Sequence, residues 1–322
     1  MADEWQTEFT SYALAQIDDF IAAHPGYTRQ GVAQPGHGAT NRVTFARHGD
    51  DIVVFKVFCE AERKERECYG LRHWHETGLV PKLIWDAGPR MIVISHVPGT
   101  YLHTVRAQDG DALWREACRT TGRAAGALTQ VPLSPADRAA VEARFYGELG
   151  ALEAYLGRIL ELAWRINARD PSFGGEYWRT NLDFIESQMG RLLSEPRVLY
   201  HQDVANLHVR CGQFIGFFDL EMCRVGGASL QLAAALGVFV ANREGWSPFL
   251  EGWEEATSAA LSREERRSAA AASYLLAWRE ISRYFSYDGT PGTGYAWASP
   301  AEPTRYRRAI EGVNALLGVA WG

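Results

Sequence analysis

LYHQDVANLHV (residues 199–209) is followed, after a short predicted hairpin, by GFFDLE (residues 216–221). Two carboxylates, Asp203 and Asp219, therefore lie on the loops that flank a small β-hairpin, where both can face one cleft. Phosphoryl transfer needs such a pair, because one carboxylate orients the attacking hydroxyl and the other holds magnesium against the nucleotide phosphates. The alternative is that both are turn residues that cap strand ends. Apolar flanks on both loops favour the first interpretation, since burying uncompensated acids is costly.

The part of the chain before residue 98 is expected to form a small sheet. Four short stretches alternate in polarity or are rich in β-branched and aromatic residues, and a turn at 48–51 joins the first two. The expected strands cover residues 42–47, 52–58, 83–86 and 91–96, and one more strand is expected between Thr28 and Gly36. Helical spacing of apolar residues predicts one helix over 5–23 and another over 60–77, which Gly78 closes.

After Pro98 and Gly99 the composition becomes helical. Stretches rich in alanine, leucine and arginine predict helices, and short strand-like pieces interrupt them. The helices are expected at 112–128, 135–162 and 262–284, and the strands at 198–200, 207–210 and 214–218. A chain of 322 residues is long enough for two domains or one large two-lobed domain. The sequence therefore predicts an α+β fold with a small sheet-rich lobe at 1–97 and a larger helical lobe at 98–322.

Composition excludes several classes of protein. Hydrophobic residues make up 47% and charged residues 22%, which is far from the composition of disordered chains. The formal charge of -6 provides no overall positive field for nucleic acid or a membrane surface, so neither is an expected partner. Five scattered cysteines without a CxxC pair argue against zinc and disulfides and favour a reducing, cytoplasmic location. The longest apolar run, 230–241, is too short to span a bilayer and is expected to be a buried helix.

Lys56 is one of only three lysines in the chain. A lysine in the middle of the predicted strand IVVFKVF either extends to solvent from a half-exposed strand or is held inward by anions. Upstream, GHGATN (residues 36–41) contains glycines that allow backbone N–H groups to approach a phosphate. Downstream, Glu65 or Glu67 can pair with Lys56, and Glu67 is better placed because it shares the helical periodicity of the apolar positions. A solvated charged helix is the alternative for either glutamate.

In this order and spacing, the motifs between Thr28 and Gly237 resemble those of the aminoglycoside phosphotransferase and choline kinase family. The resemblance implies a protein-kinase-like fold of two lobes, a nucleotide-binding lobe at 1–97 and a helical lobe with the catalytic loop and the acceptor pocket at 98–322. It also implies a catalytic loop at HQDVANLH, a metal-binding element at FDLE and a hinge at ISHVPG, where Ile94 bounds the purine pocket. The implied catalytic residues are Asp203 and His201, and the implied nucleotide-binding residues are Gly36, Gly38, Thr40, Asn41, Lys56, Glu67, Ile94, Ser95 and Val97.

Three positions depart from the family pattern. His208 stands where the family usually has its metal-binding asparagine, whereas Asn206 lies two positions earlier. Because a neutral imidazole can bind a divalent ion, His208 and Asp219 are the expected metal ligands, with Asn206 as the alternative to His208. Gln202 replaces the usual glycine of the catalytic loop, and Gln231 replaces an aspartate that braces this loop.

These observations predict a cytoplasmic, Mg²⁺-dependent phosphotransferase that moves the γ-phosphate of ATP or GTP to a hydroxyl of a small molecule. Arginine greatly outnumbers lysine, which suggests a GC-rich bacterial genome and an antibiotic as acceptor. Acids on two C-terminal helices are candidates for the floor of a cationic acceptor's pocket, or simply for solvated helix faces. They are Glu251, Glu254, Glu255, Glu264, Glu265 and Asp288. The alternative function, favoured by His208 and Gln231, is a catalytically impaired module that binds a nucleotide or metabolite. The sequence carries no signal for an oligomeric state.

Overall fold

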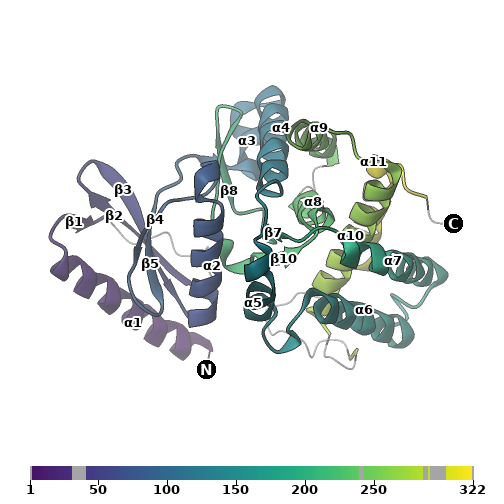
Figure 1. Cartoon of the computed structure of the whole chain (residues 1–322), viewed down its shortest axis with the longest axis horizontal. Coiled ribbons are helices and arrows are strands. Elements are labelled where there is room, and N and C mark those ends of the chain that lie inside the picture. The colour runs from purple at the N-terminus through teal and green to yellow at the C-terminus, as the bar shows by residue number, and fades with distance from the viewer. Residues whose placement is uncertain (1, 31–40, 239–242, 286–288, 291–301, 321–322) are drawn as a thin grey trace. The chain divides into compact units, whose positions relative to one another are not determined.

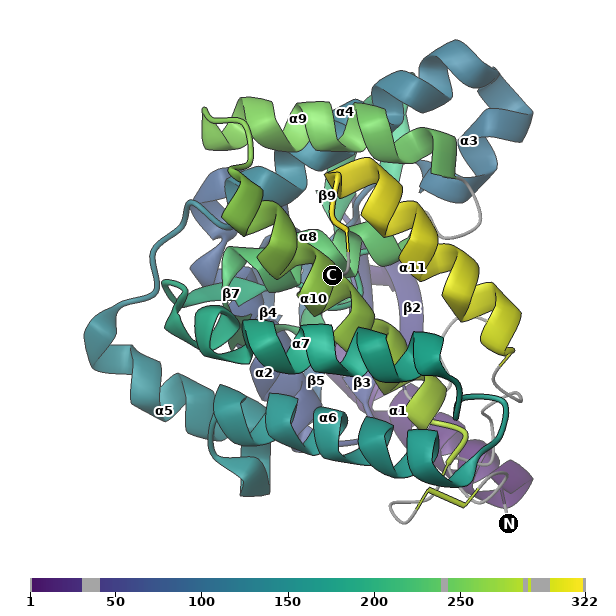
Figure 2. The same cartoon turned by 90° about the vertical axis from the view of Figure 1, so that its right-hand side faces the viewer.

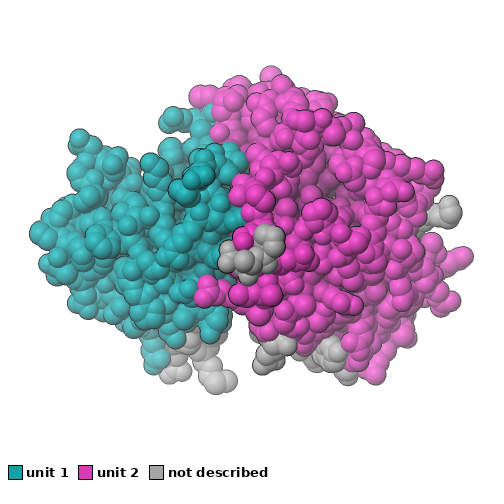
Figure 3. All heavy atoms as spheres, viewed as in Figure 1, with its two compact units in different colours: residues 1–101, 206–210, 215–223 teal, residues 102–205, 211–214, 224–322 magenta. Residues whose placement is uncertain are grey.

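The computed structural model describes residues 2–30, 41–238, 243–285, 289–290 and 302–320. The chain forms two compact units, which Figure 3 shows in different colours. Unit 1 comprises residues 1–101, 206–210 and 215–223, and unit 2 comprises residues 102–205, 211–214 and 224–322.

Unit 1 is built around a five-stranded antiparallel sheet with the strand order β1-β2-β3-β5-β4. The strands are β1 (Tyr27–Arg29), β2 (Asn41–His48), β3 (Asp51–Phe58), β4 (Leu83–Asp86) and β5 (Met91–Ser95). The predicted turn between β2 and β3 contains Gly49, whose φ of 61° favours glycine. All the predicted strands of this sheet are present, and the one expected upstream of Gly36 is β1, an edge strand that pairs with the end of β2.

Two helices accompany this sheet, α1 (Ala2–Ala23) and α2 (Ala61–His73) (Figure 1). Ile17 and Phe20 of α1 pack with Val53, Phe55 and Val57 of β3 in one buried cluster. Because side chains alternate along a strand, the intervening positions of β3 face the opposite side of the sheet. Lys56 is one of these positions, which directs it away from α1.

The sequence does not predict that residues 206–210 and 215–223 join unit 1. Strand β8 (Leu207–Arg210) pairs with β6 (Thr100–Tyr101) and belongs to a three-stranded sheet with β9 (Gln213–Phe217). The Phe217 N–H also donates to the Leu79 carbonyl oxygen at 2.8 Å. These long-range hydrogen bonds attach the hairpin and the η3 turn (Leu220–Met222) to the sheet-rich unit.

Unit 2 is mainly helical, and Figure 2 shows α6 and α7 running alongside each other near α10. The long helix α10 contacts α6, α7, α8 and α11. The helices of this unit are α3 (Leu102–Asp109), α4 (Asp111–Leu128), α5 (Pro135–Tyr146), α6 (Leu152–Arg169), α7 (Glu176–Ser194), α8 (Ala228–Val238), α9 (Trp246–Thr257), α10 (Arg263–Ser282) and α11 (Pro303–Leu317). A short antiparallel pair, β7 (Val198–Tyr200) and β10 (Arg224–Gly226), precedes α8.

The predicted elements are present, with several differences in helix limits. The single helix expected over 135–162 is two helices, α5 and α6, because Gly147 and Gly150 adopt positive φ angles that end the helical path between them. The helix expected over 60–77 ends at His73 and continues as a short 3₁₀ turn. The apolar run that was expected to be a buried helix supplies most of α8. None of the helices in the described residues has the length and apolar character that crossing a membrane requires.

Candidate active site

Lys56 and Glu67 form a buried ion pair on the side of the sheet opposite α1. Lys56 is 5% exposed and Glu67 on α2 is 1% exposed. The Lys56 Nζ donates to Glu67 Oε2 at 2.5 Å and also donates to the Asp219 carboxylate. The pairing that helical periodicity predicts for Glu67 is therefore present, and it connects three elements: β3, α2 and the segment after β9.

The charges of this group determine one another's protonation. Burial lowers the pKa of Lys56, but the carboxylates of Asp219 and Glu67 outweigh that effect and hold the pKa above its ordinary value. Burial raises the pKa of Glu67 to about 7, although the ammonium of Lys56 opposes the rise. Lys56 is therefore a permanent cation that two acidic side chains hold in a fixed position.

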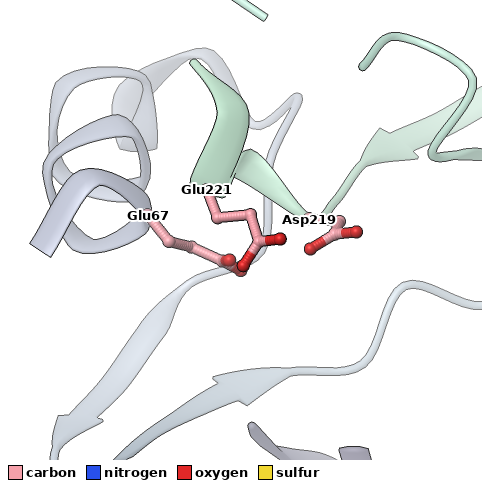
Figure 4. A group of neighbouring side chains, drawn as sticks. All are labelled: Glu67, Asp219 and Glu221. Carbon is pink, nitrogen blue, oxygen red and sulfur yellow. The ribbon is translucent and has the colours of Figure 1, made fainter. Parts of the chain in front are cut away.

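Three carboxylates gather at this point, as Figure 4 shows. Ligand oxygens of Glu67, Asp219 and Glu221 all lie within 4.8 Å of one another. Asp219 has a φ of 61°, a left-handed conformation that is uncommon outside glycine and that is often found at functional sites. Glu221 is 5% exposed and accepts hydrogen bonds from Asn41 Nδ2 at 2.5 Å and Arg63 Nη1 at 3.1 Å. Both oxygens of Glu221 are thus engaged, whereas Asp219 is one-third exposed.

The two candidates for the second metal ligand have different hydrogen-bond partners. The Asn206 Nδ2 donates to Asp219 Oδ2 at 3.0 Å, which places the amide next to this carboxylate. The His208 Nδ1 lies 2.8 Å from the Val97 carbonyl oxygen, and it must carry the proton because a carbonyl only accepts. Among the described residues, the close group of metal-ligand side chains contains no histidine.

The site fits a magnesium ion by the chemistry of its donors. Magnesium prefers hard oxygen ligands, and it is usually held by one or two carboxylates together with phosphates and water. Asp219 would supply a carboxylate, and the neighbouring Asn206, whose Nδ2 donates to Asp219, also carries an amide oxygen of the kind that magnesium prefers.

The hinge residues adjoin an aromatic group. Ile94 is buried in β5, and Ser95 exchanges hydrogen bonds with the backbone of Lys82. The rings of Tyr101, His208 and Phe218 contact one another at centroid distances between 4.7 and 5.9 Å. Burial and the nearby Asp219 carboxylate raise the pKa of Tyr101. The aromatic group therefore adjoins Val97 through His208 and lies near Asp219 through Tyr101.

The loop that carries His201 and Asp203 in unit 2 is braced from α8. The His201 N–H donates to Gln231 Oε1 at 2.7 Å, and Gln231 Nε2 approaches the His201 carbonyl oxygen at 3.5 Å. Both residues are fully buried. Gln202 donates to the Tyr155 hydroxyl at 3.2 Å, and Asp203 is exposed. Gln231 therefore holds the backbone of this loop despite replacing the expected aspartate.

Asp203 lines a cavity of about 320 Å³ within unit 2, together with side chains from α8, α10 and α11. Arg279 of α10 is among the lining residues. Burial lowers the pKa of Arg279, but Tyr155, Glu280, Tyr200 and Asp203 outweigh this effect and hold it above its ordinary value. Arg279 is therefore a charged neighbour of Asp203.

The expectation of an acidic pocket floor is not met at this cavity. None of the five described candidate acids lines it. Glu254 accepts from Leu261 N–H and Arg266, Glu255 pairs with Arg119 and Arg123, and Glu264 pairs with Arg191. Arginines from other helices thus pair with these acids, and Asp288 lies outside the described residues.

Three predicted nucleotide-binding residues, Gly36, Gly38 and Thr40, also lie outside the described residues. Two residues enter the site that the sequence-based list of ligands leaves out. Glu221 has a local signal, because it lies two positions after Asp219. No local sequence pattern indicates Arg279, since its approach to Asp203 depends on how α10 packs against the rest of unit 2.

Comparisons with known proteins show the family and the fold. The model of the phosphotransferase enzyme family matches residues 31–272. The crystal structure of aminoglycoside phosphotransferase APH(4)-Ia is 14% identical, with a TM-score of 0.55 over 93% of this chain and 99% of that one. An ethanolamine kinase from Plasmodium vivax is 13% identical, with a TM-score of 0.55 over 90% and 82%. Macrolide 2'-phosphotransferase MphH from Brachybacterium faecium is 17% identical, with a TM-score of 0.52 over 92% and 96%. No curated protein matches this chain in sequence. The structural likeness confirms the predicted fold class.

Proposed function

Because the chain belongs to the phosphotransferase enzyme family, we propose that it uses Mg²⁺ and ATP to phosphorylate a hydroxyl of a small molecule in the cytoplasm. The observation that carries this proposal is the buried Lys56–Glu67 pair with Asp219 beside it. Structures similar to this one were crystallised with ADP, with AMP-PNP and hygromycin B, and with ATP and streptomycin, which supports a nucleotide donor and a hydroxylated acceptor.

Lys56 is the phosphate-binding cation in this proposal. Glu67 holds its ammonium in place, and the raised pKa of Lys56 keeps the charge at every physiological pH. A fixed cation binds nucleotide phosphates and offsets the charge that develops on the transferred group.

Asp219 and Asn206 are the proposed magnesium ligands, in preference to Asp219 and His208. The amide of Asn206 is already at Asp219, whereas the close group of metal-ligand side chains in the described residues contains no histidine. Magnesium, when bound, would neutralise charge on the nucleotide phosphates. Asn206 directly precedes β8, so its position is set by the start of that strand and not by the number of residues after Asp203.

Asp203 is the proposed base that orients the acceptor hydroxyl and takes its proton. The hydrogen bonds from Gln231 to the His201 backbone hold the loop that carries this carboxylate. The alternative of an impaired binding module rested on His208 and Gln231, which replace the asparagine and the aspartate of the family pattern. This alternative loses support, because Gln231 still braces the loop and Asn206 lies next to Asp219.

Magnesium-dependent binding of ATP tests the metal assignment. We expect Asn206→Ala to raise the Mg²⁺ concentration needed for half-maximal ATP binding by about tenfold or more, since metal affinity depends strongly on each ligand. His208→Leu is expected to leave this Mg²⁺ dependence unchanged. Calorimetric titration of ATP at a series of Mg²⁺ concentrations measures both variants. If His208→Leu but not Asn206→Ala raises the Mg²⁺ concentration for half-maximal ATP binding, the metal ligand is His208 and not Asn206.

His208 also bears on the choice between ATP and GTP. The Val97 carbonyl accepts from His208 Nδ1, so a guanine donor at this carbonyl would have to share it with the histidine. Guanine presents N–H donors where adenine presents a ring nitrogen acceptor, and an unpaired buried donor costs about 1–3 kcal/mol. We therefore expect GTP to bind about five- to a hundredfold more weakly than ATP. Titration with both nucleotides checks this, and equal affinity would contradict it; His208→Leu is expected to narrow the difference.

A further inference from the structure

The cavity that contains Asp203 carries information about the acceptor, if the proposed function holds. Its volume of about 320 Å³ lies at the lower end of the range for small-molecule sites. Its walls are largely apolar and come from three helices. Ala233 and Leu236 belong to α8, Ala277 to α10, and Ile310 and Val313 to α11. An acceptor with an apolar body would bury that body here.

The charged residues of this cavity are few and balanced. Asp203 and Glu280 are acidic, and Arg279 and Arg305 are basic. Glu280 is shared between two arginines, with contacts of 3.3 Å to Arg279 and 2.5 Å to Arg283. Among the residues that the structure describes, Arg305 has no ion-pair partner. In the proposed function Asp203 binds the acceptor hydroxyl, and Glu280 is paired with arginines. The cavity therefore has an available cation, Arg305, and no carboxylate that is available for a second group of the acceptor.

A polycationic acceptor does not fit these charges. Each ammonium group taken from water needs a carboxylate or another acceptor to offset its desolvation. The described acids that could have formed such a floor lie outside this cavity, and arginines hold Glu254, Glu255 and Glu264. Arg279 and Arg305 would in addition repel ammonium groups.

We propose that the acceptor is an amphipathic hydroxy acid: a molecule with an apolar body in this cavity, a hydroxyl at Asp203 and a single anionic group that Arg305 binds. Aminoglycoside-type polycations are poor acceptors for this chain. The inference rests on the proposed function, because it takes Asp203 as the group that receives the hydroxyl.

Three probe acceptors of equal chain length isolate the effect of charge. They are ω-hydroxydodecanoate, dodecanediol and aminododecanol, and hygromycin B serves as a polycation. Each is incubated with the full chain, ATP and Mg²⁺, and phosphorylated product is quantified by mass spectrometry. We expect kcat/KM for ω-hydroxydodecanoate to exceed that for aminododecanol by at least about tenfold. Faster transfer to aminododecanol or hygromycin B would overturn the proposal.

Charge reversal at the rim supplies the matched test. Arg305→Glu is expected to lower kcat/KM for ω-hydroxydodecanoate by about tenfold or more and to leave KM for ATP unchanged. Arg308→Glu is the control, because Arg308 is an exposed arginine of the same helix that does not line the cavity. Equal effects of the two variants would refute the role of Arg305.

Binding of Mg²⁺ and ATP, measured on the same samples, distinguishes a failure of the acceptor proposal from a failure of the proposed function. If the nucleotide binds but no transfer to ω-hydroxydodecanoate occurs, the acceptor proposal fails and the proposed nucleotide site stands. If the nucleotide does not bind, the proposed function itself fails.

Discussion

Asp203→Asn is expected to lower turnover by a factor of about 10²–10⁴, the usual contribution of a positioned general base. Asparagine has nearly the same shape as aspartate, but its amide cannot accept the proton of the acceptor hydroxyl. The affinity for ATP is expected to stay unchanged, because Lys56, Asp219 and Asn206 carry phosphate and metal binding in the other compact unit.

Steady-state ADP formation and equilibrium binding of ATP measure the two halves of this prediction. Asp183→Asn provides a matched control, because Asp183 is an exposed aspartate of α7 that does not line the cavity. Undiminished turnover in Asp203→Asn would remove this residue from the chemistry. Loss of ATP affinity in the same variant would mean that the loop also shapes the nucleotide site.

Local patterns predict much of the fold and part of the site. Because side chains alternate along β3, Lys56 lies on the other face of the sheet from Val53, Phe55 and Val57. Helical spacing selects Glu67 as the partner of Lys56. These predictions succeed because strand and helix periodicities are properties of neighbouring residues. The prediction of an enzyme of the phosphotransferase class is confirmed by the family match, which covers the same motifs.

Other features depend on contacts that no local pattern encodes. Counting residues from Asp203 selects His208, whereas the register of β8 against β6 sends His208 to the hinge and leaves Asn206 beside Asp219. Glu255 looks like a solvated or substrate-facing acid in the sequence. In the structure it pairs with Arg119 and Arg123 of α4, a partner that only helix packing determines.

Lys56→Met is expected to affect both stability and nucleotide binding. The substitution leaves Glu67 buried without its cation, and breaking a buried pair in this way costs about 3–5 kcal/mol of unfolding free energy. The variant also loses the cation proposed to bind phosphate, and a charge-assisted hydrogen bond of about 1.5–3 kcal/mol corresponds to about ten- to a hundredfold in affinity. Lys82→Met, which alters an exposed lysine, is the control and is expected to change neither quantity.

A double variant separates the two effects of losing Lys56. Lys56→Met combined with Glu67→Met replaces both buried charges by apolar side chains of similar length, and such replacements are often neutral or stabilising. We expect denaturant unfolding to show that most of the lost stability returns, while ATP binding stays as weak as in Lys56→Met. A double variant as unstable as the single one would show that unpaired Glu67 is not the cause. Restored ATP binding would show that the pair serves the fold alone, because the phosphates would then bind without Lys56.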